Sequence, residues 1–314
     1  MTETTTSIVR EIAEWKDRRN AVLLVHNYQR PELQDEADFL GDSLGLSRQA
    51  AESDADVIVF CGVHFMAETA SVLCPDRTVL IPDPESGCPM ANMIDAAQLR
   101  AMKQKHPDAV VVCYVNSTAE VKAQSNLCCT SANATDVVNS VEAGREIIFV
   151  PDKYLGAWTA AQTGRDLILW EGYCPTHACI TPEDVERARR EHPDAAVVVH
   201  PECEPEVSAM ADPEVARLAD AVESTSGMCR FAAESDAAEF LVGTEIGMLY
   251  RLQKDNPGKE FYPVSASAVC SNMKRNTLEK VLWSLQDMQH EVTVPPQVAE
   301  RARGAIEAMV RIGR

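Results

Sequence analysis

Three cysteines that lie far apart in the chain have the residue type and spacing for one shared metal centre. Each follows a short hydroxyl-rich stretch, at distances of 45, 43 and 45 residues. Two metal chemistries suit three thiolates: a structural zinc ion with a fourth ligand such as His177, or a [4Fe–4S] cluster whose fourth iron stays open as a Lewis acid. The cysteines are Cys88, Cys174 and Cys270, and the hydroxyl positions are Ser43, Ser131 and Thr225.

The other cysteines form no recognisable framework. The chain has eleven in all, an odd number, and no two have the Cys-x-x-Cys spacing of a zinc ribbon or a thioredoxin-like pair. Cys61, Cys113 and Cys229 lie in or beside apolar runs, where cysteine behaves as a small buried hydrophobic residue. The regularly spaced cysteines are therefore the candidate ligands.

Polar side chains also recur where three apolar runs end. His26, Tyr114 and His200 occupy equivalent positions, 88 and 86 residues apart. Packing alone does not require a polar residue at all three, so we expect them to face a binding site. Their groups suit a small oxygen-rich substrate better than a sealed structural metal. Besides the cysteines, the predicted site collects His26, Asn27, Tyr28, Ser43, Tyr114, Asn116, Ser131, His200, Glu202 and Thr225.

A threefold repeat of one chain unit must position these residues. A helix end, a buried strand and a polar cluster occur at residues 18–28, 106–116 and 192–202. A second apolar strand follows at residues 56–60, 146–150 and 239–242. A third strand then runs into each cysteine. Apolar strands that alternate with helices are typical of parallel sheets covered on both faces, whose ligands bind beyond the strands' carboxyl ends. The sequence thus predicts three similar Rossmann-like α/β/α domains facing one centre.

The predicted domain boundaries follow from this repeat. We expect the units at residues 1–95, with an N-terminal helix, 96–180 and 181–275, and closing helices at 276–314. The third unit has about eight extra residues, which we expect within the acidic stretch 203–213.

Helix start signals support the repeat. Asp95 precedes a helical run to His106, and Thr181 is followed by proline and acidic residues, as at a helix N-cap. An amphipathic pattern at residues 296–312 predicts a final long helix.

Charge and hydropathy limit the partners. The formal charge is −19 at pH 7, which would repel nucleic acid and anionic membranes. The first residues have no basic segment followed by an apolar one, so we expect no signal peptide, and no apolar run reaches the roughly 18 residues of a membrane span. We predict a soluble, cytoplasmic protein.

Nine short motifs occur in order over nearly the whole chain. They are HNYQ (26–29), GDSL (41–44), GVHFMAETA (62–70), GCPMANM (87–93), YVNSTAEVKA (114–123), TSANA (130–134), HPEC (200–203), STSGM (224–228) and CSNMKRNTLEK (270–280). Each motif alone is weak, but the ordered set is specific. Together they resemble the quinolinate synthase family, also called quinolinate synthetase A.

The resemblance implies a fold, a cofactor and a reaction. The fold is three α/β domains around a pseudo-threefold axis, with one [4Fe–4S] cluster per chain at the centre. The reaction is a condensation of iminoaspartate (iminosuccinate) with dihydroxyacetone phosphate to quinolinate, releasing phosphate and two waters, in de novo NAD biosynthesis. The implied partners are these substrates, the iron–sulfur assembly machinery and L-aspartate oxidase as a functional partner, with no nucleic acid and no membrane.

The resemblance also assigns roles to residues. The cluster ligands carry over to Cys88, Cys174 and Cys270. The substrate-binding positions are His26, Ser43, Tyr114, Asn116, Ser131, His200, Glu202 and Thr225. Glu202 is the expected base, with Tyr28 or His26 as proton donors, and Phe65 and His177 are further pocket positions.

Two features depart from the family pattern. Some members carry two more cysteines before the last ligand, forming a redox-switchable pair, whereas this chain has Val264 and Ser267, so we expect no such switch. Glu223 stands where similar sequences have glycine, next to Thr225.

Two other functions stay open at this point. A three-cysteine cluster reductase that removes a hydroxyl from a small phosphorylated substrate would need an electron donor. A non-enzymatic iron or oxygen sensor would need a basic surface for nucleic acid, which the charge of −19 contradicts.

Overall fold

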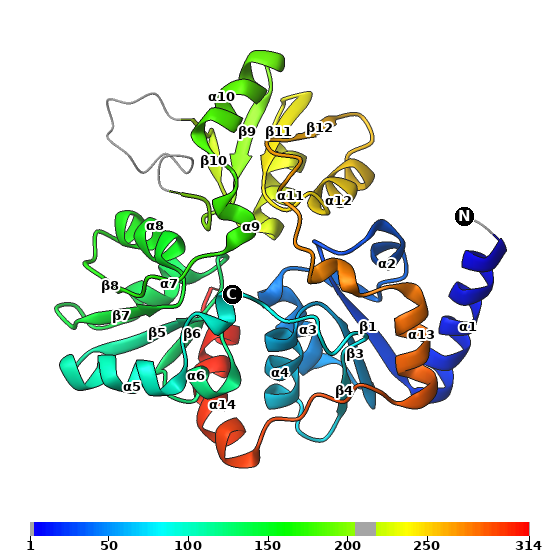
Figure 1. The fold of residues 1–314 in the computed structure, drawn as a ribbon. Coiled ribbons are helices and arrows are strands. Elements are labelled where there is room, and N and C mark those ends of the chain that lie inside the picture. Colours follow the sequence, from blue (N-terminus) through cyan, green and yellow to red (C-terminus); the bar gives the residue numbers. More distant parts are fainter. Residues whose placement is uncertain (1–2, 205–217, 314) are drawn as a thin grey trace.

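Three parallel sheets arranged around a common centre make up the protein (Figure 1). The computed structural model describes residues 3–204 and 218–313. Within these residues, each sheet has four strands in the same order, namely β2-β1-β3-β4, β6-β5-β7-β8 and β10-β9-β11-β12. The predicted α/β architecture of three similar units is confirmed.

Strand β1 is an inner strand of the first unit's sheet, and its Leu23, Leu24 and Val25 are completely buried. Helix α1 (Glu3–Arg19) covers one face of its sheet, where Ile12 packs into the same apolar cluster as Leu23. The other elements are β1 (Ala21–His26), α2 (Pro31–Asp35), β2 (Phe39–Gly41), α3 (Ser43–Glu52), β3 (Val57–Cys61), α4 (His64–Leu73), β4 (Thr78–Leu80) and the 3₁₀ turn η1 (Met90–Asn92).

The second unit begins with α5 (Ala96–Lys105), for which Asp95 is the N-cap. The Asp95 side chain accepts from Gln98 N, and the Gln98 side chain accepts from Asp95 N, which confirms the predicted helix start. The other elements are β5 (Val110–Tyr114), α6 (Ala119–Lys122), β6 (Leu127–Cys129), α7 (Ala134–Asn139), β7 (Ile147–Val150), α8 (Lys153–Thr163), β8 (Ile168–Leu169) and α9 (Pro175–Ala178).

The third unit begins with α10 (Pro182–Glu191), capped by Thr181 as predicted. The segment around the predicted insertion lies largely outside the described residues, which resume at Leu218. The other elements are β9 (Ala196–Val199), β10 (Ala221–Val222), α11 (Thr225–Glu234), β11 (Glu239–Gly243), α12 (Met248–Asp255), β12 (Glu260–Pro263) and the 3₁₀ turn η2 (Met273–Arg275).

Two helices close the chain and pack on the first two units. Helix α13 (Leu278–Asp287) lies beside α1, and its Val281 and Leu285 are completely buried. Helix α14 (Pro296–Arg311) confirms the predicted amphipathic helix and packs against α3, α4, α6 and β6, so it spans two units (Figure 1).

One strand of each sheet was missing from the sequence prediction. Strands β2, β6 and β10 lie at sheet edges, and each comes just before a hydroxyl-rich stretch. They are only three, three and two residues long, too short for a hydropathy pattern.

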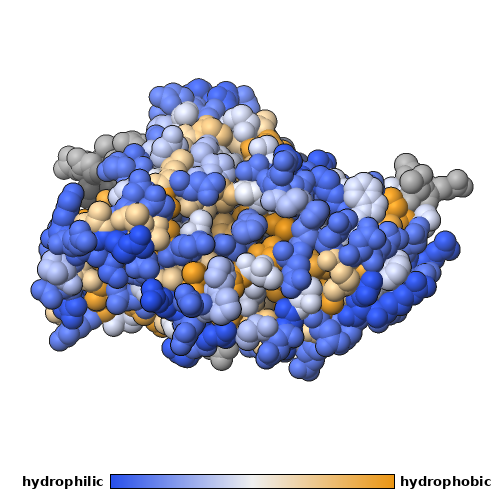
Figure 2. Space-filling model, turned by 60° about the horizontal axis from the view of Figure 1, so that its bottom comes forward, coloured by the Kyte–Doolittle hydropathy of each residue, from blue (hydrophilic) through white to orange (hydrophobic). Residues whose placement is uncertain are grey.

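The hydrophilic character of the outer surface agrees with the many charged residues in the chain. Figure 2 shows a face of mainly hydrophilic residues with smaller hydrophobic areas between them. No described helix is both long and apolar enough to cross a membrane.

Candidate active site

One cavity lies between the three units and receives side chains from each of them. Asn27 does not line it; this residue is buried behind the wall and donates through Nδ2 to the Thr225 hydroxyl at 2.9 Å. The other predicted residues do line it: His26, Tyr28, Ser43, Phe65, Cys88, Tyr114, Asn116, Ser131, Cys174, His177, His200, Glu202, Thr225 and Cys270.

Several lining residues were missed by the sequence reasoning. Most of them are neighbours of predicted positions, so the same motifs could have indicated them. Three methionines and a valine give the wall its apolar part, and a glycine, an aspartate and two threonines complete it. These residues are Asp42, Val63, Met66, Gly87, Met90, Thr130, Thr176 and Met273.

The same local turn occurs at His26, the last residue of β1, and at His200, which directly follows β9. The backbone N–H two residues further on donates to the imidazole Nδ1, from Tyr28 at 3.1 Å and from Glu202 at 3.3 Å. Burial lowers the pKa of each histidine to about 3, so both are neutral at pH 7. Because Nδ1 accepts a hydrogen bond, the single ring proton of each lies on Nε2.

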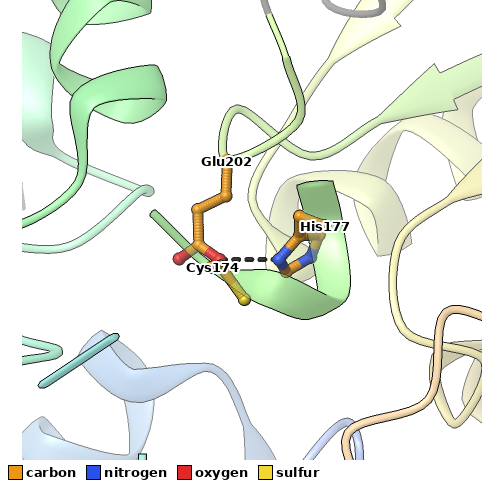
Figure 3. Close-up of side chains that lie close together, drawn as sticks. All are labelled: Cys174, His177 and Glu202. Carbon is orange, nitrogen blue, oxygen red and sulfur yellow. Dashed lines mark ion pairs between the residues drawn. The ribbon is translucent and has the colours of Figure 1, made fainter. Parts of the chain in front are cut away.

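Glu202 is the most densely contacted polar group in the cavity. Its Oε1 accepts a short hydrogen bond from the Tyr114 hydroxyl and a longer one, 3.4 Å, from Asn116 Nδ2. Its Oε2 lies 2.7 Å from His177 Nδ1, a close ion-pair contact that is not aligned as a hydrogen bond (Figure 3). Burial works to raise its pKa, but the imidazoles of His177 and His200 and the bond from Tyr114 outweigh burial and lower it, so Glu202 is a carboxylate.

A short polar chain connects Tyr28 to Glu202 through His177. The Tyr28 hydroxyl lies 2.6 Å from Thr244 Oγ1 and 3.3 Å from His177 Nε2, and Thr244 Oγ1 lies 2.9 Å from the same nitrogen. Burial and the charge of Glu202 raise the pKa of Tyr28 well above its usual value, as they do for Tyr114. Both phenols therefore keep their protons and can donate them.

Two of the three hydroxyl positions begin helices. Ser43 is the first residue of α3, capped by Asp42, and Thr225 is the first residue of α11, capped by Ser224. Glu223 lies against Gly227 in the same helix end, and Thr225 still faces the cavity. Ser131 differs from the prediction, because it comes three residues before α7 in a turn held by Asn133, whose Oδ1 accepts from Thr130 N at 2.8 Å.

The three cysteines share a second local pattern. Each precedes a short helical turn, and the backbone N–H of the third residue on, in Ala91, His177 and Met273, lies by the sulfur. Burial raises the pKa of all three thiols, that of Cys88 to about 12. The cysteines also border an outer hollow with Cys179 and Ser267, so they separate it from the inner cavity.

The spacing of the ligand atoms limits which metal group the three cysteines could hold together. Among the described residues, the three ligand atoms that lie within 4.8 Å of one another belong to Cys174, His177 and Glu202 (Figure 3). The three sulfurs are not such a set, so they are too far apart for one tetrahedral ion. The three sulfurs are spaced more widely than the ligands of a single ion, and each faces backbone N–H groups. This arrangement fits a polynuclear cluster.

Three similar α/β units bring cysteines, imidazoles and a buried carboxylate to one cavity. These features define an α/β enzyme in which one unit occurs three times and cysteines line the active site. The family model described as quinolinate synthetase A protein matches residues 10–311, and the chain belongs to this family. A quinolinate synthase of Dehalococcoides mccartyi (strain ATCC BAA-2266 / KCTC 15142 / 195) is 56% identical, with 97% of this chain and 98% of the relative covered. Quinolinate synthases of Methanosarcina barkeri (strain Fusaro / DSM 804; 97% of each chain covered) and Desulforudis audaxviator (strain MP104C; 97% and 98%) are 53% and 51% identical.

Proposed function

We propose that this protein is a quinolinate synthase, which condenses iminoaspartate with dihydroxyacetone phosphate to quinolinate in de novo NAD biosynthesis. The observation that carries the proposal is the cavity itself, because it gathers three cysteines and the predicted acid–base residues from three units. Membership of the quinolinate synthetase A family and relatives named quinolinate synthase support it. Release of phosphate and two waters balances the reaction without external electrons.

We propose Cys88, Cys174 and Cys270 as the ligands of one [4Fe–4S] cluster. When bound, such a cluster supplies an open iron that polarises a hydroxyl or carboxylate oxygen. The thiols are protonated in the metal-free protein, so loading the site requires their deprotonation. The backbone N–H groups at each sulfur then stabilise the thiolates.

Substrate binding must offset several negative charges in an acidic protein. The hydroxyls of Ser43 and Thr225 stand at helix starts, where backbone N–H groups and the helix dipole favour anions. His26 and His200 offer Nε2–H donors without adding a charge. Oδ1 of Asn116 is buried and has no hydrogen-bond partner in the described structure, so a substrate donor is its natural complement.

Proton transfers are assigned to three side chains. Glu202 is a buried carboxylate held by Tyr114 and His177, and it takes the protons that carbon–carbon bond formation and dehydration release. Tyr28 and His26 supply protons to leaving oxygens. Tyr28 and Glu202 both contact His177, so the proposed donor and the proposed base lie next to the same imidazole.

Anaerobic purification with iron, sulfide and zinc counts, followed by an assay for quinolinate from the two substrates, tests the proposal. We expect four irons and four sulfides per chain, and quinolinate without added reductant. Stoichiometric zinc in place of iron would overturn the cluster, and activity only with a reductant would favour the reductase. An iron-loaded protein that makes no quinolinate would overturn the proposed reaction.

A further inference from the structure

We propose that two buried acidic side chains, Asp152 and Glu245, are positioning residues that hold the backbone of Cys174 and Cys270 for cluster binding. This inference rests on the proposed function in one respect, because it takes these cysteines as cluster ligands.

The two carboxylates occupy equivalent positions in their units. Asp152 is the second residue after β7, and Glu245 is the second residue after β11. Glu245 Oε1 accepts the backbone N–H of Cys270 at 3.1 Å. The Asp152 carboxyl lies by the backbone N–H of Cys174, and it accepts the backbone N–H of Leu155 at 2.7 Å. In both units an acidic side chain thus lies at the backbone N–H of the cysteine, although the two side chains differ.

The first unit lacks this arrangement. Val63 is the second residue after β3, and its side chain contributes to the apolar wall of the cavity. Cys88 therefore has no carboxylate from the corresponding position. A similar helical turn follows all three cysteines. Only Cys174 and Cys270, however, have an acidic side chain at their backbone N–H.

The complete burial of these acidic side chains needs a structural reason, because burial of a charged group is unfavourable. Both side chains are completely buried, and burial raises the pKa of Asp152 well above its usual value. The charged form of a buried carboxyl group is unfavourable unless it is paired or hydrogen-bonded. Glu245 is compensated by Lys274 Nζ at 3.0 Å and by Gly247 N at 2.7 Å. Asp152 Oδ2 has no hydrogen-bond partner among the described residues, so Asp152 depends on its backbone donors.

Glu245 also connects the cysteine to the proposed proton donor. The Lys274 ammonium that neutralises Glu245 donates as well to the backbone carbonyl of Tyr28. Glu245 therefore fixes both Cys270 and the turn that carries Tyr28, whereas Asp152 interacts electrostatically with Glu202. The two residues should differ in their effect on catalysis for this reason.

The test compares cluster retention in the full-length, anaerobically loaded protein. The variants are Asp152→Ala and Glu245→Ala, and the control is Asp95→Ala, which removes an N-cap of the same kind at a residue that lines neither the inner cavity nor the outer hollow. The readout is decay of the brown chromophore in the presence of an iron chelator. Loss of groups that orient metal ligands typically costs about 10- to 100-fold, so we expect decay at least about tenfold faster in both variants and wild-type decay in the control.

Conservative variants guard against misfolding. Asp152→Asn and Glu245→Gln keep an oxygen for the cysteine N–H, so we expect decay rates between wild type and the alanine variants. Glu245→Gln should also lower kcat per loaded cluster, because Lys274 loses its counter-charge.

The possible results are distinguishable. Wild-type decay in Asp152→Ala and Glu245→Ala, or in both conservative variants where the alanine variants do not fold, would overturn the inference. Decay that accelerates only in proportion to a lower melting temperature of the metal-free variant would also overturn it, because the role would then be structural. A wild-type protein that binds no iron would overturn the proposed function instead.

Discussion

The hydroxyl of Tyr114, at the end of β5, donates a short hydrogen bond to Oε1 of Glu202, which follows β9. The two residues belong to different units, 88 positions apart in the chain. The carboxylate proposed as the base is therefore oriented only when the second and third units are correctly docked. His177 contacts the other oxygen, so both oxygens of Glu202 are restrained.

Glu202→Gln should remove the base and leave the site otherwise intact. The amide has nearly the same shape but cannot accept a proton at neutral pH, and general-base catalysis is worth about 10²- to 10⁴-fold. We expect quinolinate formation to fall within that range while iron content stays at the wild-type level. Glu204→Gln, two residues along and outside the cavity lining, is the matched control. Equal turnover in Glu202→Gln and wild type would disprove the assignment.

Tyr114→Phe should shift the pH dependence of catalysis. The hydrogen bond from Tyr114 stabilises the Glu202 carboxylate and lowers its pKa, so its removal raises that pKa. Activity that needs the carboxylate should then be lost at a higher pH as the solution is acidified. The acidic limb of the kcat/KM profile measures this shift. Tyr250→Phe, whose hydroxyl bonds Asp35 outside the cavity, should leave the limb in place.

His26→Asn should flatten the pH dependence of stability. The folded-state pKa of about 3 lies below the usual 6.5, so between these values the unfolded chain binds more protons and stability falls as pH decreases. One such group contributes up to about 1.4 kcal/mol per pH unit. Urea unfolding of the metal-free proteins from pH 6.5 to 4 should show this extra slope in wild type only. Parallel curves would contradict a neutral, buried His26.

Replacing Cys88, Cys174 or Cys270 with Ala should abolish the brown chromophore and the activity. Cys179→Ala is a demanding control, because Cys179 lines the outer hollow together with all three of these cysteines but does not line the inner cavity. We expect it to keep its iron, as should Cys61→Ala, Cys113→Ala and Cys229→Ala. Iron and sulfide counts decide, and loss of the cluster in Cys179→Ala with retention in Cys88→Ala would reverse the ligand assignment.

Gly247→Ala should disturb the link between Glu245 and Tyr28. An added Cβ would lie 2.6 Å from Lys274 Nζ, 2.7 Å from Tyr28 O and 2.8 Å from Glu245 Oε2, so these groups must move. Overpacking of this kind costs roughly 1–3 kcal/mol. Thermal unfolding should show the loss, whereas Gly258→Ala, with no atom within 4 Å of its Cβ, should unfold like wild type.

The sequence predicted the parts of the fold that local chemistry determines. Thr181 and Asp95 carry helix caps in their own side chains, and the central strands are apolar enough to be found from hydropathy alone. The edge strands β2, β6 and β10 depend on pairing with a neighbour already in place, so their few residues contain no sufficient signal.

The site was predictable where the repeat or a motif indicated it, and not where contacts cross units. Register brought His26, Tyr114 and His200 to equivalent strand ends, and the structure places all three on one cavity. Thr244 directly follows β11 and could have been found by the same rule. The pairing of Lys274 with Glu245 could not, because nothing in either local sequence indicates the other.

The joining of three units in one polypeptide has a consequence for how the centre could diverge. A homotrimer of a single unit would have to repeat every substitution three times around its axis. In this chain the second position after β3, β7 or β11 is Val63, Asp152 or Glu245, respectively. Covalent fusion thus permits three cysteines that share one backbone pattern to have different side chains around them in each unit.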